Sequence, residues 1–193
     1  MGIWLGYQLA QAGPWKSWAE AALALPLVLP PTVLGYYFIV AFAGKSFFGE
    51  PLVFSFTGLL IASIIVNLPF AIQPIQRAYE AIPEEIKEAA KVSGLSTWQR
   101  FRFIELPLAW RGILSGAAMT FAHTLGEFGV VLMVGGAIPG ETKTASIAIY
   151  DKVQTFDTAG AGALSVILLL ISLVAIAISY GVFGRNTAGV RRA

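Results

Sequence analysis

The sequence predicts an all-α membrane protein, a polytopic helical bundle with about five spans, the first of them incomplete. Of its 193 residues, 56% are apolar and only 12% are charged, which is too apolar for a soluble domain of this size. Four stretches, residues 21–44, 51–76, 112–134 and 158–184, match or exceed the roughly 20 apolar residues that a helix needs to cross a bilayer. We therefore expect residues 1–193 to form a single transmembrane domain.

The chain opens with a short apolar and aromatic segment that ends at Gly13-Pro14, a helix stop. Residues 2–12 would cover only ~16 Å at helical rise, about half of a membrane. We interpret residues 1–12 as the remnant of a first transmembrane helix whose beginning is missing. The alternative is an interfacial helix with Trp4 and Tyr7 at the level of the lipid headgroups.

The stretches 21–44 and 51–76 contain prolines, which lack the N–H that a helix interior needs. We expect these prolines to break the helical ladder and to act as hinges or pore-facing points, or else as static kinks of the bundle. They are Pro26, Pro30, Pro31, Pro69 and Pro74. In the third stretch, Gly112 and Gly116 form a GxxxG pattern that lets two membrane helices approach closely.

A polar loop, residues 80–107, separates the second and third stretches. Pro83 suits the first turn of a helix, and Glu84 and Glu85 favour the positive end of its dipole. Gly94 suits a left-handed position that ends this helix. Ser96, with Gln99 three residues later, predicts a capping box that starts a second helix. The loop is thus predicted to be a helix, a tight glycine turn and another helix.

Seven loop positions also follow a fixed spacing: E-A-A, three residues, Gly, nine residues, then I-x-L-P. They are Glu88, Ala89, Ala90, Gly94, Ile104, Leu106 and Pro107. This pattern resembles the cytoplasmic coupling loop of ABC-importer permeases. Two further runs, residues 25–37 and 123–151, resemble the molybdate branch of that family, and tungstate and sulfate permeases share parts of them. The resemblance extends from about residue 19 to residue 183.

The resemblance implies a helical bundle of the ABC-importer permease type that works by alternating access. It implies that the seven loop residues dock on a separate ATPase. Independently of the resemblance, Ala89 and Ala90 are helix formers with little bulk, so another protein surface can approach them closely. The implied partners are a second permease copy in a homodimer, a cytoplasmic ABC ATPase dimer, an external molybdate-binding protein and membrane lipid. ATP and Mg²⁺ would be bound by the ATPase, so this chain would carry no cofactor, metal or catalytic residue and would not itself be an enzyme.

Charge placement predicts the orientation in a prokaryotic inner membrane. With the loop 80–107 and the C-terminus in the cytoplasm, ten of the 13 basic residues lie inside, among them Arg185, Arg191 and Arg192. Only Lys45, Lys143 and Lys152 lie outside. This asymmetry agrees with the positive-inside rule. The basic residues of the loop are balanced by acids, so no nucleic-acid surface is expected.

The pore or gate candidates are Asn67, Pro69, Thr124 and Glu127. Glu127 and His123 lie four residues apart on one face of a predicted membrane helix, where ionisable groups are costly. This pair is open to a structural role or to a proton relay. The spans offer hydroxyls and amides but no Lys or Arg, which favours a weak, transient pathway with selectivity in the external binding protein.

Two alternatives remain for the function. Within the same family, the chain could be a sulfate or tungstate permease. In another class, it could be a proton-coupled secondary transporter that uses Glu127 and His123. The chain has no cysteine, so a thiolate metal site and a redox pair are excluded.

Overall fold

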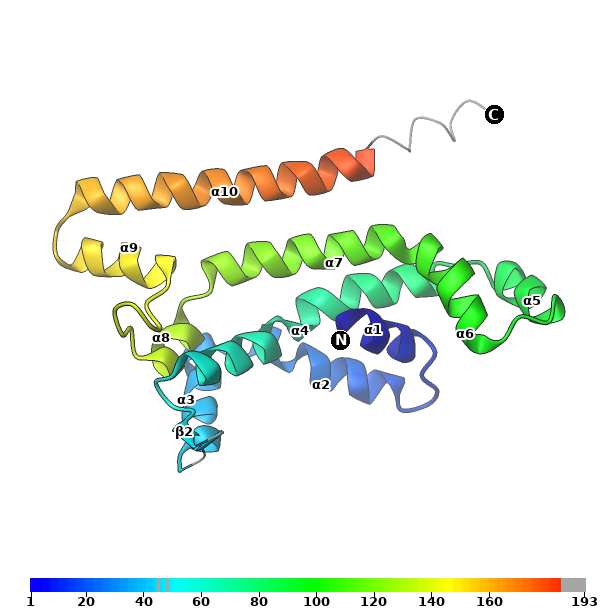
Figure 1. Cartoon of the computed structure of the whole chain (residues 1–193), viewed down its shortest axis with the longest axis horizontal. Coiled ribbons are helices and arrows are strands. Elements are labelled where there is room, and N and C mark those ends of the chain that lie inside the picture. The colour runs from blue at the N-terminus through cyan, green and yellow to red at the C-terminus, as the bar shows by residue number, and fades with distance from the viewer. Residues whose placement is uncertain (45, 48, 185–193) are drawn as a thin grey trace. The chain divides into compact units, whose positions relative to one another are not determined.

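A computed structural model describes residues 1–44, 46–47 and 49–184, and these residues are mostly helical (Figure 1). The helices are α1 (Gly2–Ala10), α2 (Lys16–Val28), α3 (Pro31–Phe42), α4 (Phe56–Glu80), α5 (Glu84–Val92), α6 (Thr97–Arg100), the π-helix η1 (Phe101–Glu105), α7 (Leu106–Gly126), α8 (Gly129–Gly135), α9 (Ala145–Gln154) and α10 (Thr158–Gly184). Within this described part the only strands are β1 (Ser46–Phe47) and β2 (Glu50–Pro51), which pair antiparallel. The predicted all-α class is confirmed.

Two helices are long and apolar enough to cross a membrane alone: α4, and α10 over Thr158–Ile178. Two further spans arise if bent pairs each count as one. These pairs are α2 with α3, bent by 107°, and the stretch Thr97–Gly126 with α8, bent by 62°. The described residues thus hold two to four spans. The break at Pro30 and Pro31 agrees with the expected interruption of 21–44, whereas the break within 112–134 was not predicted.

The first break follows from two consecutive prolines. Pro30 has extended backbone angles, φ −54° and ψ 136°, and precedes the first residue of α3, Pro31. Because a residue before proline is pushed out of the helical region, Pro30 cannot continue α2. Pro31 in turn suits the first turn of a new helix.

The second break lies at Glu127 and Phe128, between Gly126 and Gly129. Glycine is a poor helix former, so the flanking pair weakens the helix on both sides. Phe128 leaves the helical region with φ −129° and ψ −58°. The carbonyl of Glu127 instead accepts a hydrogen bond of 2.7 Å from the Ser146 hydroxyl. A side chain thus replaces the missing helical donor.

Pro69 and Pro74 do not end the helix that contains them, since α4 runs from Phe56 to Glu80. Each of these prolines removes one backbone donor without ending the helix, and a role as hinge or static kink stays a prediction. Pro69 is fully buried, and the carbonyl of Pro74 lies against Gly112 of α7. Close packing on both sides holds the helix together through these positions.

The chain divides into two compact units. The first unit comprises the described residues of 1–23, 68–120 and 178–184, and its core is Tyr7, Ile75, Tyr79, Ile82 and Ala109. The second unit comprises residues 24–67 and 121–177, and its core is Ala62, Val66, Val130 and Val134, with Leu34, Phe38 and Phe42 packed against it. Both α4 and α7 contribute to each unit.

The GxxxG prediction is confirmed inside the first unit. A methyl group at Gly112 would meet the Cβ of Ala78 at 2.2 Å and the Pro74 carbonyl oxygen at 2.8 Å. One at Gly116 would meet the Ala71 carbonyl oxygen at 2.7 Å. These distances leave no room for a side chain, so the two glycines bring α7 directly onto the backbone of α4.

We predict that Gly112→Ala lowers the thermal stability of the purified protein in detergent. Overpacking costs about 1–3 kcal/mol, more than the ~1 kcal/mol that alanine gains over glycine in a helix. Gly162→Ala in α10 is the matched control, because nothing lies within 4 Å of the added methyl group there. Equal stability of the two variants would contradict close packing at Gly112.

Candidate functional site

The loop 80–107 has the predicted helix–turn–helix form. Helix α5 begins at Glu84, with Pro83 as its N-cap residue and Glu84 and Glu85 in its first turn. Gly94 has φ +75°, the left-handed conformation that favours glycine. The Ser96 hydroxyl accepts from the Gln99 N–H at 3.3 Å, and the Gln99 side chain accepts from the Ser96 N–H at 2.9 Å. The capping box is therefore present in both directions.

The second loop helix continues into a membrane helix without an intervening turn. α6 passes into η1, and η1 passes directly into α7. Pro107, the second residue of α7, has no N–H, and its ring would clash with the carbonyl four residues earlier. The wider turns of η1 accommodate this residue, as π-helical insertions do within α-helices.

A buried ion pair and an aromatic cluster hold this part of the loop. Arg100 and Glu105 lie 3.2 Å apart and are both shielded from solvent. The ring of Phe101 contacts Tyr7 and Tyr79, with centroid distances of 4.7 and 6.3 Å. These contacts fasten the second loop helix to α1 and α4 within the first unit.

The seven motif residues fall into three groups by exposure. Glu88, Ala89, Gly94 and Pro107 are exposed, Ile104 and Leu106 are half-buried, and Ala90 is 4% exposed. The expectation that both alanines present a small outer surface is therefore wrong for Ala90, which packs inside the first unit. Its small size serves internal packing at that position.

Three large apolar side chains of the loop face outward. Val92 is 89% exposed, Trp98 is 67% exposed and Phe103 is 68% exposed. They lie on both sides of the Gly94 turn, next to the exposed motif residues. Trp98 also contacts the Phe101 ring, with a centroid distance of 5.5 Å, but most of all three side chains is exposed, so the loop presents an apolar surface to its surroundings.

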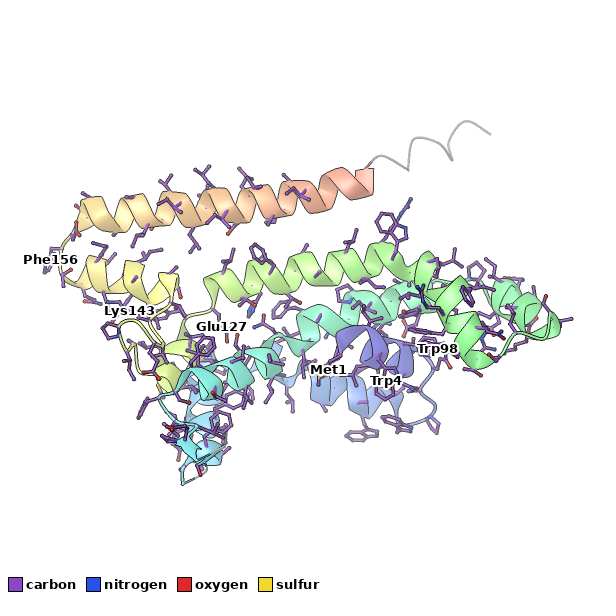
Figure 2. All side chains as sticks on the ribbon, viewed as in Figure 1. Met1, Trp4, Trp98, Glu127, Lys143 and Phe156 are labelled. Atoms are coloured by element: carbon purple, nitrogen blue, oxygen red, sulfur yellow. The ribbon has the colours of Figure 1, made fainter. Side chains whose placement is uncertain are left out.

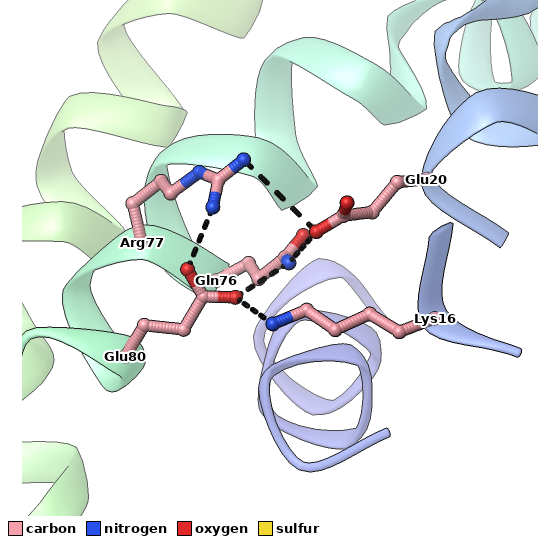
Figure 3. A network of polar contacts seen from close by, with 5 residues as sticks. All are labelled: Lys16, Glu20, Gln76, Arg77 and Glu80. Atoms are coloured by element: carbon pink, nitrogen blue, oxygen red, sulfur yellow. Dashed lines mark hydrogen bonds and ion pairs between the residues drawn. The ribbon is translucent and has the colours of Figure 1, made fainter. Parts of the chain in front are cut away.

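A charged network lies at the end of α4 and the start of α2 (Figure 3). Glu80 pairs with Lys16 at 2.7 Å and with Arg77 at 2.8 Å. Gln76 is only 1% exposed, and its amide donates to both Glu20 and Glu80. The network joins α2 to α4 within the first unit and satisfies a buried amide.

A second polar cluster lies in the second unit and contains two of the four pore candidates. Glu127 is 7% exposed, and one of its carboxylate oxygens accepts from the Ser63 hydroxyl at 2.7 Å and from the Asn67 amide at 3.1 Å. The Asn67 carbonyl oxygen lies 3.0 Å from Nδ1 of His123. Asn67 therefore bridges the two ionisable groups that the sequence singled out.

The other two pore candidates are Thr124 and Pro69. Thr124 is exposed, and its carbonyl oxygen accepts from the Glu127 N–H at 3.3 Å. Pro69 belongs to the first unit and is fully buried. Among the described residues no group of three or more His, Asp or Glu side chains is placed to hold a metal ion.

Residues 1–190 match the family model described as "Binding-protein-dependent transport system inner membrane component". The chain belongs to this family. It is therefore a multi-pass membrane component of an ABC-type import system, an ABC-importer permease. Its transmembrane helices agree with that assignment.

Curated relatives of this permease carry two kinds of name. The chain is 44% identical to the molybdenum transport system permease protein ModB of Azotobacter vinelandii over 73% of its length, and it covers 66% of that relative. It is 34% identical to the ModB protein of Escherichia coli K12, with 92% and 82% of the two chains covered. It is also 30% identical to the sulfate transport system permease protein CysT of Escherichia coli K12, with 91% and 67% covered.

A solved structure supports the fold. A bacterial ABC transporter involved in the import of the acidic polysaccharide alginate superposes with a TM-score of 0.71 at 17% identity. The match covers 96% of this chain and 72% of that chain. At this identity the match establishes the shared fold of the permease.

Sequence reasoning missed the Arg100–Glu105 pair, the network around Gln76 and the role of Ser63. Glu105 is the variable residue x of the I-x-L-P pattern. A charged residue between two apolar ones could have indicated a buried ion pair. Gln76, Arg77 and Glu80 share a helix face by their spacing, but nothing in the sequence identified α2 as the partner.

We predict that Glu127→Gln leaves the thermal stability of the permease nearly unchanged, whereas Glu127→Leu lowers it by about 1–3 kcal/mol. A glutamine oxygen still accepts from Ser63 and Asn67, but leucine removes the acceptor and leaves buried donors without it. Thermal unfolding in detergent would measure both. Equal losses in the two variants would show that the carboxylate matters for something other than these hydrogen bonds.

Proposed function

We propose that this chain is the permease subunit of an ATP-driven importer that moves an oxyanion, molybdate, from an external binding protein into the cytoplasm. The observation that carries the proposal is the loop from α5 to η1. In a member of this family, it combines a glycine-hinged helix pair, an exposed apolar surface and direct continuity with a membrane helix.

The loop is suited to pass motion from an ATPase to the membrane. Val92, Trp98 and Phe103 would bury apolar area against the ATPase, with Glu88 and Ala89 beside them. Because α6, η1 and α7 form one continuous helical run, displacement of the loop would move α7 as well. The ion pair of Arg100 with Glu105 stiffens this run. ATP and Mg²⁺ would be bound by the ATPase.

The remaining partners follow from the same proposal. A second copy of the chain would complete the translocation pathway, and each copy would receive one ATPase subunit. The loop and the C-terminus would be cytoplasmic, as the positive-inside rule predicts. Lys45, Arg185, Arg191 and Arg192, which contribute to that rule, lie outside the described residues.

Molybdate is favoured because the relatives at 44% and 34% identity carry molybdenum-transport names, while the sulfate relative is at 30%. The cluster of Ser63, Asn67 and His123 contains no Lys or Arg, and its Ser63 and Asn67 donors are bound to the Glu127 carboxylate. A site without Lys or Arg would hold a divalent oxyanion only weakly, which suits passage rather than storage. Sulfate and tungstate remain the alternative cargoes.

A proton-coupled carrier is the second candidate, because Asn67 links Glu127 to His123. In the proposed mechanism, these residues instead brace α4 against the break after α7, within the second unit. The two mechanisms differ in what drives uptake, so they are separable by experiment.

We predict that Gly94→Val abolishes both substrate-stimulated ATP hydrolysis and uptake in vesicles containing the permease, its ATPase and the binding protein. Valine is strained at φ +75° and would displace both loop helices. Gly140→Val is the matched control, because Gly140 has φ +78° and open space around it but lies outside the coupling loop. Normal stimulated hydrolysis in Gly94→Val would refute the coupling role.

We predict that molybdate uptake requires ATP and survives collapse of the proton gradient, also in Glu127→Gln. Competition with sulfate and tungstate in the same vesicles would rank the cargoes. Uptake that follows the proton gradient and is lost in Glu127→Gln would favour the proton-coupled carrier.

A further inference from the structure

Helix α1 packs directly on α4 through two glycines. Gly2 and Gly6 lie one helical turn apart and so share one face of α1. A methyl group at Gly6 would meet the Cγ2 of Ile75 at 2.7 Å, and one at Gly2 would meet the Cβ of Ala71 at 3.4 Å. This is the small-xxx-small spacing that lets two helices approach closely. A side chain at Gly6 would push α1 away from α4, so the glycine face fixes the position of α1.

Tyr7, the residue after Gly6, joins α1 to the coupling loop. Its side chain is only 7% exposed. Its ring packs edge-on against Phe101 of η1, at a centroid distance of 4.7 Å, and against Tyr79 of α4, at 5.2 Å. Edge-to-face pairs of this kind are favourable beyond the area that they bury. Tyr7 therefore contacts the loop and α4 at the same time.

The hydroxyl end of Tyr7 lies beside the ion pair that precedes α7. It faces the side chains of Gln11, Arg100 and Glu105. Arg100 is the last residue of α6 and Glu105 is the last residue of η1, and their side chains lie 3.2 Å apart. The next residue, Leu106, begins α7. Tyr7 thus meets the loop at the point where the loop continues into α7.

On either side of Tyr7, the seam between α1 and the loop is loosely packed. A cavity of about 280 Å³ lies between α1 and the start of the second loop helix, and another of about 230 Å³ lies between α1 and α5. Trp4 and Trp98, labelled in Figure 2, line the first cavity and are 58% and 67% exposed. Tyr7 lines both cavities. The contact between α1 and the loop is therefore concentrated at Tyr7.

The two ends of the loop are attached to the membrane helices in different ways. At the second end, α6, η1 and α7 form one continuous helical run. At the first end, residues 81–83 form a turn between α4 and α5, where the chain can pivot. Movement of the loop would reach α7 through the rigid connection, but would reach α4 only weakly through the turn. A brace between the loop and α4 would remove this difference.

We propose that Tyr7 is a positioning residue for coupling. Through Tyr7, α1 ties the second loop helix to α4, so that α4 and α7 follow the loop as one body. The proposal deepens the proposed function and rests on it, because it describes how ATP-driven movement of the loop is shared between two helices. α1 acts as an internal strut of the first unit, held to α4 by Gly2 and Gly6 and to the loop by Tyr7.

The test is the amount of molybdate imported per ATP hydrolysed, measured in vesicles that contain the permease, its ATPase and the binding protein. Tyr7→Leu should lower this ratio severalfold, because ATP then drives loop movements that α4 does not follow. Tyr7→Phe keeps the ring contacts and should restore most of the ratio. Trp4→Leu is the matched control, because Trp4 lies on the same helix but is more than half exposed, and it should leave the ratio unchanged.

The ratio separates a positioning role from simple loss of folded protein. Partial unfolding would lower uptake and ATP hydrolysis in the same proportion, and such behaviour of Tyr7→Leu would overturn the proposal. An equal fall of the ratio in Tyr7→Leu and Trp4→Leu would also overturn it. If the wild-type chain shows no ATP-driven uptake, the proposed function fails and this proposal with it; normal coupling in both the wild-type chain and Tyr7→Leu overturns this proposal alone.

A disulfide tests the contact of α1 with α4 in the permease alone. The chain has no cysteine, so Gly2→Cys with Ala71→Cys would carry the only two. Their Cβ atoms would lie 3.4 Å apart, close to the roughly 3.5–4.5 Å that a disulfide requires. Oxidation should form this cross-link, and the cross-linked permease should keep its ratio of molybdate to ATP, because α1 and α4 already move together.

Gly13→Cys with Ala71→Cys is the matched control for cross-linking. A methyl group at Gly13 has nothing within 4 Å, so this pair should stay reduced under the same oxidation. Failure of the Gly2 pair to cross-link, or equal cross-linking of the two pairs, would show that α1 is not held on α4. Loss of uptake on cross-linking would show that the two helices must separate during transport. Either result would overturn the strut.

Discussion

A hydrocarbon environment offers no hydrogen bonds, and this constraint governs the places where this permease departs from regular helix. At three of these places a side chain takes over a backbone group. Ser146 donates to the carbonyl of Glu127 at the break after α7, and Thr142 donates to the carbonyl of Gly135 at the end of α8. Ser55 accepts from the N–H of Gly58 in the first turn of α4. At these places a polar side chain therefore replaces a missing helical partner.

The same constraint applies to the cluster of Glu127, Ser63, Asn67 and His123. A carboxylate with two neutral donors on one oxygen and no described cation beside it is an unusual group to keep inside a membrane. The Asn67 amide nitrogen donates to Glu127 and to the Ser63 hydroxyl, and the Asn67 carbonyl oxygen lies against Nδ1 of His123. The cluster is locally well connected, which is what a brace across α4 and the start of α8 requires. A proton route would also need a path to water on both sides.

Local signals in the sequence were sufficient for the coupling loop, because each one acts within a few residues. In the loop, Gly94 adopts the left-handed conformation and Ser96 forms the capping box with Gln99. Beyond the loop, Gly112 and Gly116 allow the close helix contact that their spacing predicted. Span boundaries were harder to predict, because hydropathy does not distinguish a straight helix from two helices at an angle. At Pro30–Pro31 the break follows from local chemistry, whereas α4 passes Pro69 and Pro74 because tertiary packing outweighs two missing donors. The partners of Gln76 and Ser63 are distant in sequence, so no local pattern identified them.

The network around Glu80 has a consequence for how the chain is made. Insertion machinery responds to Lys and Arg near the ends of membrane segments and only weakly to Asp and Glu. Lys16 and Arg77 would therefore help to orient the nascent chain while Glu20 and Glu80 still have little influence. After folding, the same acids neutralise those cations around a buried amide. One set of side chains would thus serve first as a topological signal during biogenesis and afterwards as a clamp between two helices.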